Sequence, residues 1–151
     1  MPDIKVVGVI SKPGIPHAST ILSDLVAWWK ERGVETRLDH ESARYLTRDQ
    51  VPQPIALAVC DVSFISITMI LPALTGLLAD DADMVILVKP QFELDRDQVG
   101  KGGIIRDPAL HLQACQRVEK AVQQLGFHTQ IIPSPILGAE GNREFLLHAQ
   151  H

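Results

Sequence analysis

Two residues of opposite charge follow two consecutive apolar segments of the chain. Asp61 follows the segment 55–60, and Lys89 follows the segment 83–88. If both segments are neighbouring strands, the two side chains meet at one rim of a sheet. A simple ion pair is one interpretation of that arrangement. The other is acid–base chemistry, in which a lysine whose pKa is lowered by burial deprotonates a sugar hydroxyl.

Glu144 is the third residue that could take part in such chemistry. It lies in the last apolar segment, 143–148, which follows a polar loop. Together with Asp61 it would orient Lys89 and set the charge state of the lysine. The set suits an SN2 methyl transfer, in which alignment of the reacting atoms does most of the work. The candidate catalytic residues are therefore Asp61, Lys89 and Glu144.

Basic residues accompany glycines in the segment VGKGGIIRDP. Lys101 and Arg106 stand there beside three glycines, an arrangement suited to phosphate because backbone NH groups and basic side chains both bind anions. A flexible surface turn explains the same residues. The segment EGNREF leaves the same choice open, since Asn142 and Arg143 also suit a turn at the surface.

Hydrophobic patterning predicts the elements that position these residues. Short β-branched or apolar segments predict strands at 4–10, 34–38, 55–60, 83–88, 128–132 and 143–148. Apolar stripes and capping residues predict helices over 19–33, 68–79 and 107–126. This alternation predicts a single α/β domain over 1–151, Rossmann-like, with a mostly parallel sheet of about six strands flanked by helices.

The composition limits the classes of partner. The chain has 46% hydrophobic residues and a net charge of -4, so it can build a core but has no overall basic field. A nucleic acid would need a local basic patch. We expect Cys60 and Cys115 to be buried free thiols of a cytoplasmic protein. The six histidines show no ligand spacing and no apolar segment is long enough to span a membrane, so we expect neither a metal nor a membrane partner.

From Ala43 to His148 the chain resembles the hemolysin-A (TlyA) type of FtsJ-like RNA methyltransferases. The matching segments are ARYLT, CDVSFIS, ILPAL, LVKPQFE, VGKGGIIRDP and SPILGAEGNREFLLH. The resemblance implies S-adenosylmethionine as cofactor and a ribose 2′-hydroxyl of ribosomal RNA as substrate. It implies catalytic roles for Asp61, Lys89 and Glu144 as the last three members of a Lys-Asp-Lys-Glu set. The first lysine has no counterpart here. It also implies RNA contacts by Lys101, Arg106 and Arg143.

The front of the chain resembles a different family, the bacterial NAD kinases. The segment IKVVGVISKPG, a following helix and ARYL carry this resemblance. We therefore expect a kinase-like half over 1–46 joined to a methyltransferase-like half over 47–151. The S4 domain, the glycine-rich cofactor loop and the third strand of such methyltransferases have no counterpart, which predicts a sheet that is reduced relative to the full fold.

The residues predicted to bind the cofactor are Ser11, Gly14, Asp39 and Asp61. An acidic residue at the end of a second strand commonly binds a ribose, although Asp39 could equally cap the segment that follows it. Pro13 and Pro16 remove NH donors from the first loop.

Three hypotheses remain open: a methyltransferase-like domain, a non-catalytic nucleotide-binding module, and a chimeric fold without a ligand. The missing strand exposes a sheet edge in all of them, which predicts a homo-oligomer.

Overall fold

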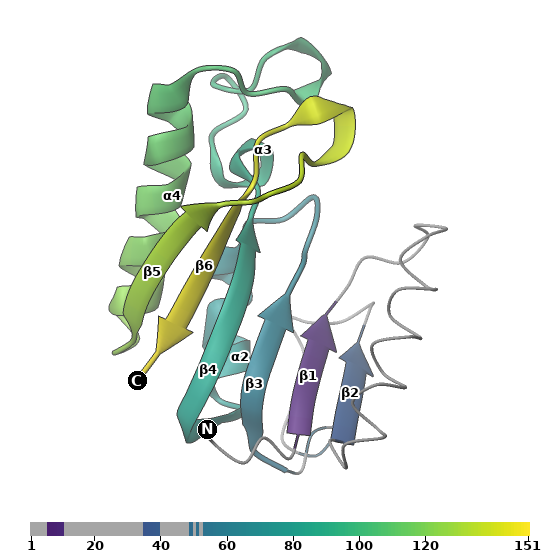
Figure 1. The fold of residues 1–151 in the computed structure, drawn as a ribbon, viewed down its shortest axis with the longest axis vertical. Coiled ribbons are helices and arrows are strands. Elements are labelled where there is room, and N and C mark those ends of the chain that lie inside the picture. Colours follow the sequence, from purple (N-terminus) through teal and green to yellow (C-terminus); the bar gives the residue numbers. More distant parts are fainter. Residues whose placement is uncertain (1–5, 11–34, 40–48, 50, 52) are drawn as a thin grey trace.

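The computed structural model describes residues 6–10, 35–39, 49, 51 and 53–151. Within these residues, six strands form one sheet in the order β2-β1-β3-β4-β6-β5 (Figure 1). The strands are β1 Val6–Ile10, β2 Glu35–Asp39, β3 Ile55–Cys60, β4 Leu78–Val88, β5 His128–Pro133 and β6 Phe145–Gln150. The predicted Rossmann-like α/β class is confirmed.

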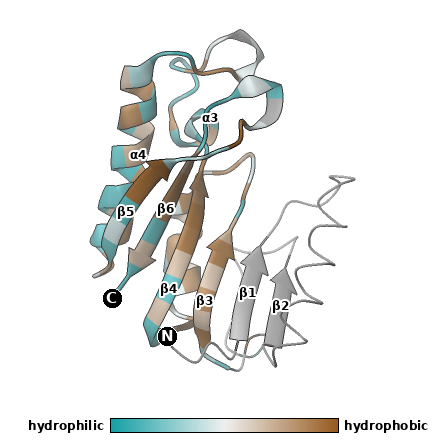
Figure 2. Cartoon of the chain, viewed as in Figure 1, coloured by the Kyte–Doolittle hydropathy of each residue, from teal (hydrophilic) through white to brown (hydrophobic). Residues whose placement is uncertain are grey.

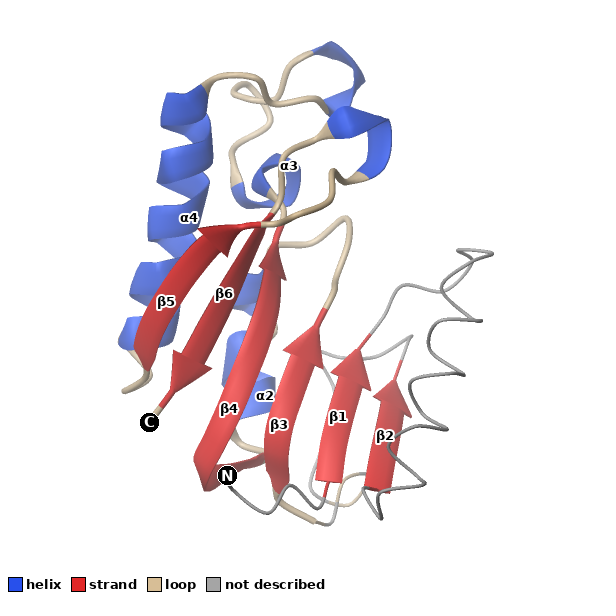
Figure 3. Ribbon diagram, in the orientation of Figure 1, coloured by secondary structure: helices blue, strands red, loops and turns tan. Residues whose placement is uncertain are grey.

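The sheet is mixed, because its last strand in the chain reverses direction. The pairs β1–β2, β1–β3 and β3–β4 are parallel. Strand β6 runs antiparallel between β4 and β5 (Figure 3). The amino end of β6 therefore lies at the same rim as the carboxyl ends of the parallel strands, which is the rim where α/β sheets bind ligands.

Three α-helices occur in the described part of the chain: α2 Leu71–Thr75, α3 Pro90–Glu93 and α4 Pro108–Gln123. Three short 3-10 turns accompany them: η2 Ile67–Met69, η3 Lys101–Gly103 and η4 Ala139–Gly141. Helix α4 begins where the sequence predicted. The Asp107 carboxylate caps it by accepting a 2.8 Å hydrogen bond from the Ala109 amide, and Pro108 takes the first helical position.

Several predicted boundaries are wrong. The strand predicted over 83–88 begins already at Leu78, and the helix predicted over 107–126 ends at Gln123. The helix predicted over 68–79 is only the five residues of α2, because Gly76 caps it and the chain enters β4 at Leu78, which pairs with Ile55. The last strand begins at Phe145 rather than at 143, because its pairing with β4 starts where Phe145 faces Val88. The helix predicted over 19–33 lies outside the described residues.

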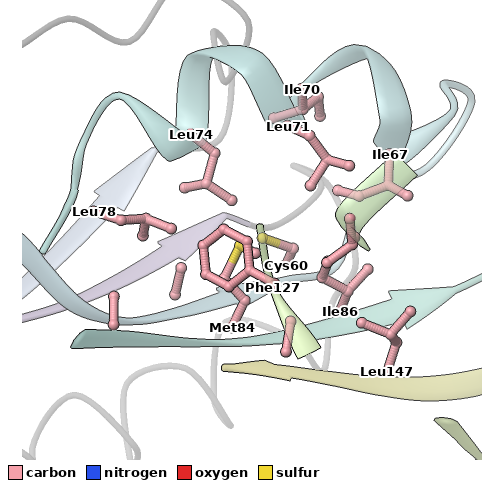
Figure 4. Packing of buried hydrophobic residues seen from close by; sticks show 14 of the residues in the cluster. Cys60, Ile67, Ile70, Leu71, Leu74, Leu78, Met84, Ile86, Phe127 and Leu147 are labelled. Atoms are coloured by element: carbon pink, nitrogen blue, oxygen red, sulfur yellow. The ribbon is translucent and has the colours of Figure 1, made fainter. Parts of the chain in front are cut away.

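The described hydrophobic core lies between the sheet and the helices α2 and α4. Figure 4 shows Leu71 and Leu74 of α2 pointing toward Met84 and Ile86 of β4. Val118 and Val122 of α4 are fully buried in the same cluster. In Figure 2, β4 changes from hydrophilic at its amino end to hydrophobic toward its carboxyl end. The carboxyl end of β4, which leads to Lys89, is thus held by buried, closely packed residues.

The two cysteines have the environment that the sequence predicted. Cys60 and Cys115 are both free and buried. Burial raises the pKa of the Cys60 thiol to about 12 and that of Cys115 to about 11, so both are protonated at neutral pH. The described helices include none that is long and apolar enough to cross a membrane.

Candidate active site at the strand ends

Lys89 and Asp61 form a close ion pair at the carboxyl ends of β4 and β3. The Lys89 Nζ atom lies 2.5 Å from Asp61 Oδ1 and donates a 2.9 Å hydrogen bond to the Ser63 hydroxyl. The lysine side chain is 11% exposed, whereas the aspartate side chain is 48% exposed. The cation is thus largely withdrawn from water, and the aspartate connects it to the open rim of the sheet.

Glu144 lies directly before β6, the strand that borders β4 opposite to β3, and lines the same cavity as Asp61. It is buried, and burial raises the pKa of its carboxyl above the ordinary value. The positive charge of Lys89 opposes that increase in the pKa, the negative charge of Asp61 adds to it, and a hydrogen bond from Gln91 opposes it. The structure therefore brings together the three residues that the sequence singled out for chemistry.

Gly138 makes room for the Glu144 carboxylate. A side chain at position 138 would overlap the carboxylate group of Glu144. The backbone around it is tied into the turn η4, because the Gly138 amide donates to the Asn142 carbonyl at 2.8 Å and the Gly141 amide to the Gly138 carbonyl at 3.2 Å. Sequence reasoning missed this role. The glycines of SPILGAEGN were the only signal for it.

Glu93 holds the loop that follows Asp61. Its carboxylate accepts hydrogen bonds from the Ser66 hydroxyl at 2.5 Å and from the Ile67 amide at 2.9 Å. Burial raises the pKa of Glu93, while these two hydrogen bonds and the charge of Arg117 oppose the increase. The segments CDVSFIS and LVKPQFE are thus joined through a buried carboxylate. No local pattern in the sequence marks Glu93 for this role.

An aromatic pair stands beside this loop. Phe64 has a φ of 66°, which is rare for a residue with a side chain, and it is 75% exposed. Its ring lies 5.2 Å from that of Phe92, measured between centroids. Strained, exposed residues of this kind cluster at functional sites.

A cavity of about 300 Å3 opens beside the two carboxylates. Its walls are mostly apolar and come from β3, β4, β6 and the loop before η4. The lining residues include Val59, Asp61, Val85, Leu87, Ile136 and Glu144. An uncharged group could enter this cavity and reach both carboxylates at its edge.

The residues predicted to bind the cofactor are only partly within the described chain. Ser11 and Gly14 lie outside the described residues. Asp39 is the last residue of β2 and pairs with Ile10, the last residue of β1. Asp61 follows β3 on the other side of β1. Asp39 and Asp61 therefore lie on either side of the carboxyl end of β1, the strand between β2 and β3.

The residues predicted to bind RNA lie in two loops above the rim. Lys101 begins η3, and Arg106 and Arg143 are exposed. Asn142 corrects the interpretation of its segment as a surface turn, because it is only 4% exposed and its side chain is hydrogen-bonded to the backbone of the other loop. Among the described residues, no group of three or more His, Cys, Asp or Glu could hold a metal ion.

One match of limited length is to an NAD kinase of Solibacter usitatus. It is 37% identical over 65 residues, which is 39% of this chain and 23% of the kinase. That match is too short to show membership of the kinase family.

Other relatives match a larger part of the chain. The 16S/23S rRNA (cytidine-2′-O)-methyltransferase TlyA of Mycobacterium tuberculosis is 43% identical over 111 residues, 73% of this chain and 41% of TlyA. The chain thus spans about two fifths of the length of the curated relatives it matches. A crystal structure described as that of a hemolysin from Lactococcus lactis has a TM-score of 0.78 at 30% identity, covering 98% of this chain and 79% of that one.

The match to a protein family extends over nearly the whole chain. It includes Asp61, Lys89 and Glu144. Residues 10–151 match the FtsJ-like methyltransferases. The chain belongs to the FtsJ-like methyltransferase family.

Proposed function

We propose that the chain is the catalytic part of an S-adenosylmethionine-dependent ribosomal RNA methyltransferase that acts on a ribose 2′-hydroxyl. The cluster of Asp61, Lys89 and Glu144 at the ligand rim carries this proposal, because it lies in a chain of the FtsJ-like family. The relative from M. tuberculosis bears that activity in its name. An rRNA substrate implies that the protein works in the cytoplasm.

Lys89 is the proposed general base. A lysine acts as a base only as the neutral amine, so the proposal includes a neighbouring carboxylate that takes up the proton that Lys89 gives away. Glu144 suits that role, because burial raises the pKa of its carboxyl and favours the protonated form. As the ribose hydroxyl loses its proton to Lys89, its oxygen would take the methyl group that S-adenosylmethionine supplies, with the carbon–sulfur bond of the donor broken and the sulfur left as a neutral thioether. Asp61 holds the resulting ammonium, and Ser63 fixes the direction of Nζ.

The sheet topology fits the cofactor. Strand β2 lies on one side of β1, and β3, the next strand of the chain, lies on the opposite side of β1. The strand order reverses at β1, and a ligand crevice is expected at the carboxyl end of a strand where this happens. S-adenosylmethionine bound there would supply an activated methyl group. Ser11, Gly14, Asp39 and Asp61 are the proposed binding residues, the carboxylates accepting hydrogen bonds from ribose and amino groups. No metal is needed for this reaction.

Lys101, Arg106 and Arg143 are the proposed contacts to RNA phosphates. Two of them carry exposed guanidinium groups, and the third lies in a glycine-rich turn whose amides suit an anion. With a net charge of -4, the chain has no overall attraction for RNA, so the local contacts must supply it.

We propose that the single domain combines a kinase-like half, 1–46, with a methyltransferase-like half, 47–151. The similarity to the Solibacter kinase supports this division. The sheet would then lack the strand that borders β2 in the full methyltransferase fold. Strand β2 is an edge of the sheet, and pairing through it would give a homo-oligomer. Sedimentation at high concentration tests this, and a monomer there contradicts it.

Calorimetric titration with S-adenosylmethionine, and with NAD in a parallel cell, tests the cofactor. Methyl transfer to ribosomal RNA is then compared between the unaltered chain, Lys89→Ala and Lys120→Ala. Lys120 lies in the last turn of α4 and serves as the control. We expect Lys89→Ala to lower the rate by about 10²- to 10⁴-fold and Lys120→Ala to leave it unchanged. Unchanged transfer in Lys89→Ala would remove the lysine from the mechanism.

Adenine nucleotide binding without methyl transfer would favour the second candidate, a non-catalytic nucleotide-binding module. The flanking positions of Asp39 and Asp61 beside β1 are the observation that favours it. Absence of heat with either ligand would leave a chimeric fold without a ligand.

A further inference from the structure

The loop with the candidate phosphate contacts and the turn with Glu144 meet at one buried side chain. Asn142 Oδ1 accepts a 3.0 Å hydrogen bond from the Ile105 amide. Its Nδ2 donates a 2.9 Å hydrogen bond to the Gly103 carbonyl. These partners lie 37 and 39 residues earlier in the chain. The side-chain amide therefore joins two loops that the backbone connects only through α4, β5 and the intervening turns.

The same residue also supports the pocket of the catalytic carboxylate. The backbone carbonyl of Asn142 accepts a hydrogen bond from the Gly138 amide at 2.8 Å, and Gly138 lies against the Glu144 carboxylate. Asn142 thus touches the glycine loop with its side chain and the Glu144 turn with its backbone. Because it is 4% exposed, water cannot readily replace the bonds that it makes.

The chemistry of the bridge requires an amide. One end must accept from an NH group and the other must donate to a carbonyl, which a carboxylate cannot do. His111 holds the loop from the other side, since its Nε2 lies 3.0 Å from the Ile105 carbonyl. The glycine loop is thereby fixed between α4 and Asn142, although its glycines give it a freely variable backbone.

We propose that Asn142 is a positioning residue that makes the glycine loop, 100–106, and the Glu144 turn, 138–144, move as one unit. A phosphate held by the loop would then fix the catalytic carboxylate at the same time. The biological role of this coupling rests on the proposed function. The coupling itself, however, is a property of the folded chain and can be measured without any activity.

The experiment uses NMR on the labelled full chain and on Asn142→Ala. It measures amide hydrogen exchange at Ile105 and Gly138 and the pH titration of the Glu144 carboxyl. We expect exchange at both amides to become about tenfold faster or more, because two buried hydrogen bonds are lost. We also expect the pKa of Glu144 to fall toward its ordinary value as the carboxyl becomes exposed. Gln98→Ala removes an exposed pair with Gln113 and should change none of these quantities.

Asn142→Asp is a second variant in case the alanine variant does not fold. The aspartate retains the acceptor for the Ile105 amide but loses the donor to the Gly103 carbonyl. We expect exchange at both amides to accelerate in this variant too. The pKa of Glu144 is compared in the alanine variant alone, because the new carboxylate would itself raise it. If either variant accelerates exchange at Ile105 but not at Gly138, the two loops are independent and the proposal is wrong.

An assay of methyl transfer distinguishes a failure of the coupling proposal from a failure of the proposed function. We expect Asn142→Ala to lower kcat and raise KM for RNA together, whereas Arg106→Ala should raise KM alone. If the unaltered chain has no activity but the three NMR quantities change together, the coupling is correct and the proposed function is not. If the chain is active and only the Ile105 amide responds, the reverse holds.

Discussion

The backbone of Gly138 lies so close to the carboxylate of Glu144 that no side chain fits between them. This contact predicts the effect of Gly138→Ala. The added methyl group must push the carboxylate away from Lys89 or open the turn. We expect unfolding to require about 1–3 kcal/mol less free energy, and methyl transfer to fall by about tenfold or more. Chemical denaturation and a rate assay measure the two effects.

Gly76→Ala is the matched control for this substitution. Gly76 has a helical backbone, with a φ of -63°, and an added Cβ would lie 3.6 Å from its nearest neighbour, the Ala73 carbonyl oxygen, which is ordinary contact. We expect a small gain in stability, about 0.4–1 kcal/mol, and no change in the rate. Equal behaviour of the two alanine variants would show that Glu144 is not confined by Gly138.

Glu144→Gln should change how stability depends on pH. Burial raises the pKa of Glu144 in the folded chain above 4.5, so its ionisation opposes folding. That cost is absent below pH 4.5, grows as the pH rises toward the folded pKa, and is complete above it. The glutamine variant should therefore be more stable than the unaltered chain at neutral pH, with the difference vanishing below about pH 4.5. Thermal unfolding across pH measures this, and a difference that persists at pH 3 contradicts it.

Glu93→Ala should loosen the loop that follows Asp61. The substitution leaves the Ile67 amide without its acceptor and frees the Ser66 hydroxyl. We expect a loss of about 1–3 kcal/mol in the free energy of unfolding and a slower methyl transfer. The exposed Asp97 provides a control, since Asp97→Ala should change neither quantity. A full rate in Glu93→Ala would show that the loop keeps its shape without the carboxylate.

Arg106→Ala and Arg143→Ala should each weaken RNA binding in a salt-dependent way. If each guanidinium contacts one phosphate, the slope of log affinity against log salt should fall by about one for each substitution. Lys120→Ala, at the far end of α4, should leave the slope unchanged. Binding measured by fluorescence anisotropy at several salt concentrations gives the slopes. An unaltered slope in both arginine variants would place the RNA elsewhere.

Sequence reasoning worked best where local chemistry decides the structure. Asp107 followed by Pro108 predicted the start of α4, and the apolar segment 55–60 predicted β3 with its observed bounds. Asp61 and Lys89 could be paired because parallel neighbouring strands end at one rim. The helix predicted over 68–79 was too long, since apolar residues of the β4 entry continue the helical pattern past Gly76.

Sequence reasoning failed where the chain makes long-range contacts. Glu93, Gly138 and Asn142 act through partners on other segments, and no local pattern marks such residues. Asn142 looked like a turn residue because asparagine beside glycine favours turns. Only the packing of the loops against each other shows that its amide is buried and paired on both sides.

The position of strand β6 in the sheet determines when Asp61, Lys89 and Glu144 can come together during folding. It is the last element of the chain, yet it lies between β4 and β5 and pairs with both. Until it inserts, β5 has no neighbour in the sheet, and Glu144 has no fixed place beside Lys89. A chain growing from its amino end therefore cannot bring Glu144 beside Lys89 and Asp61 until β6 has been made and has inserted between its two neighbours.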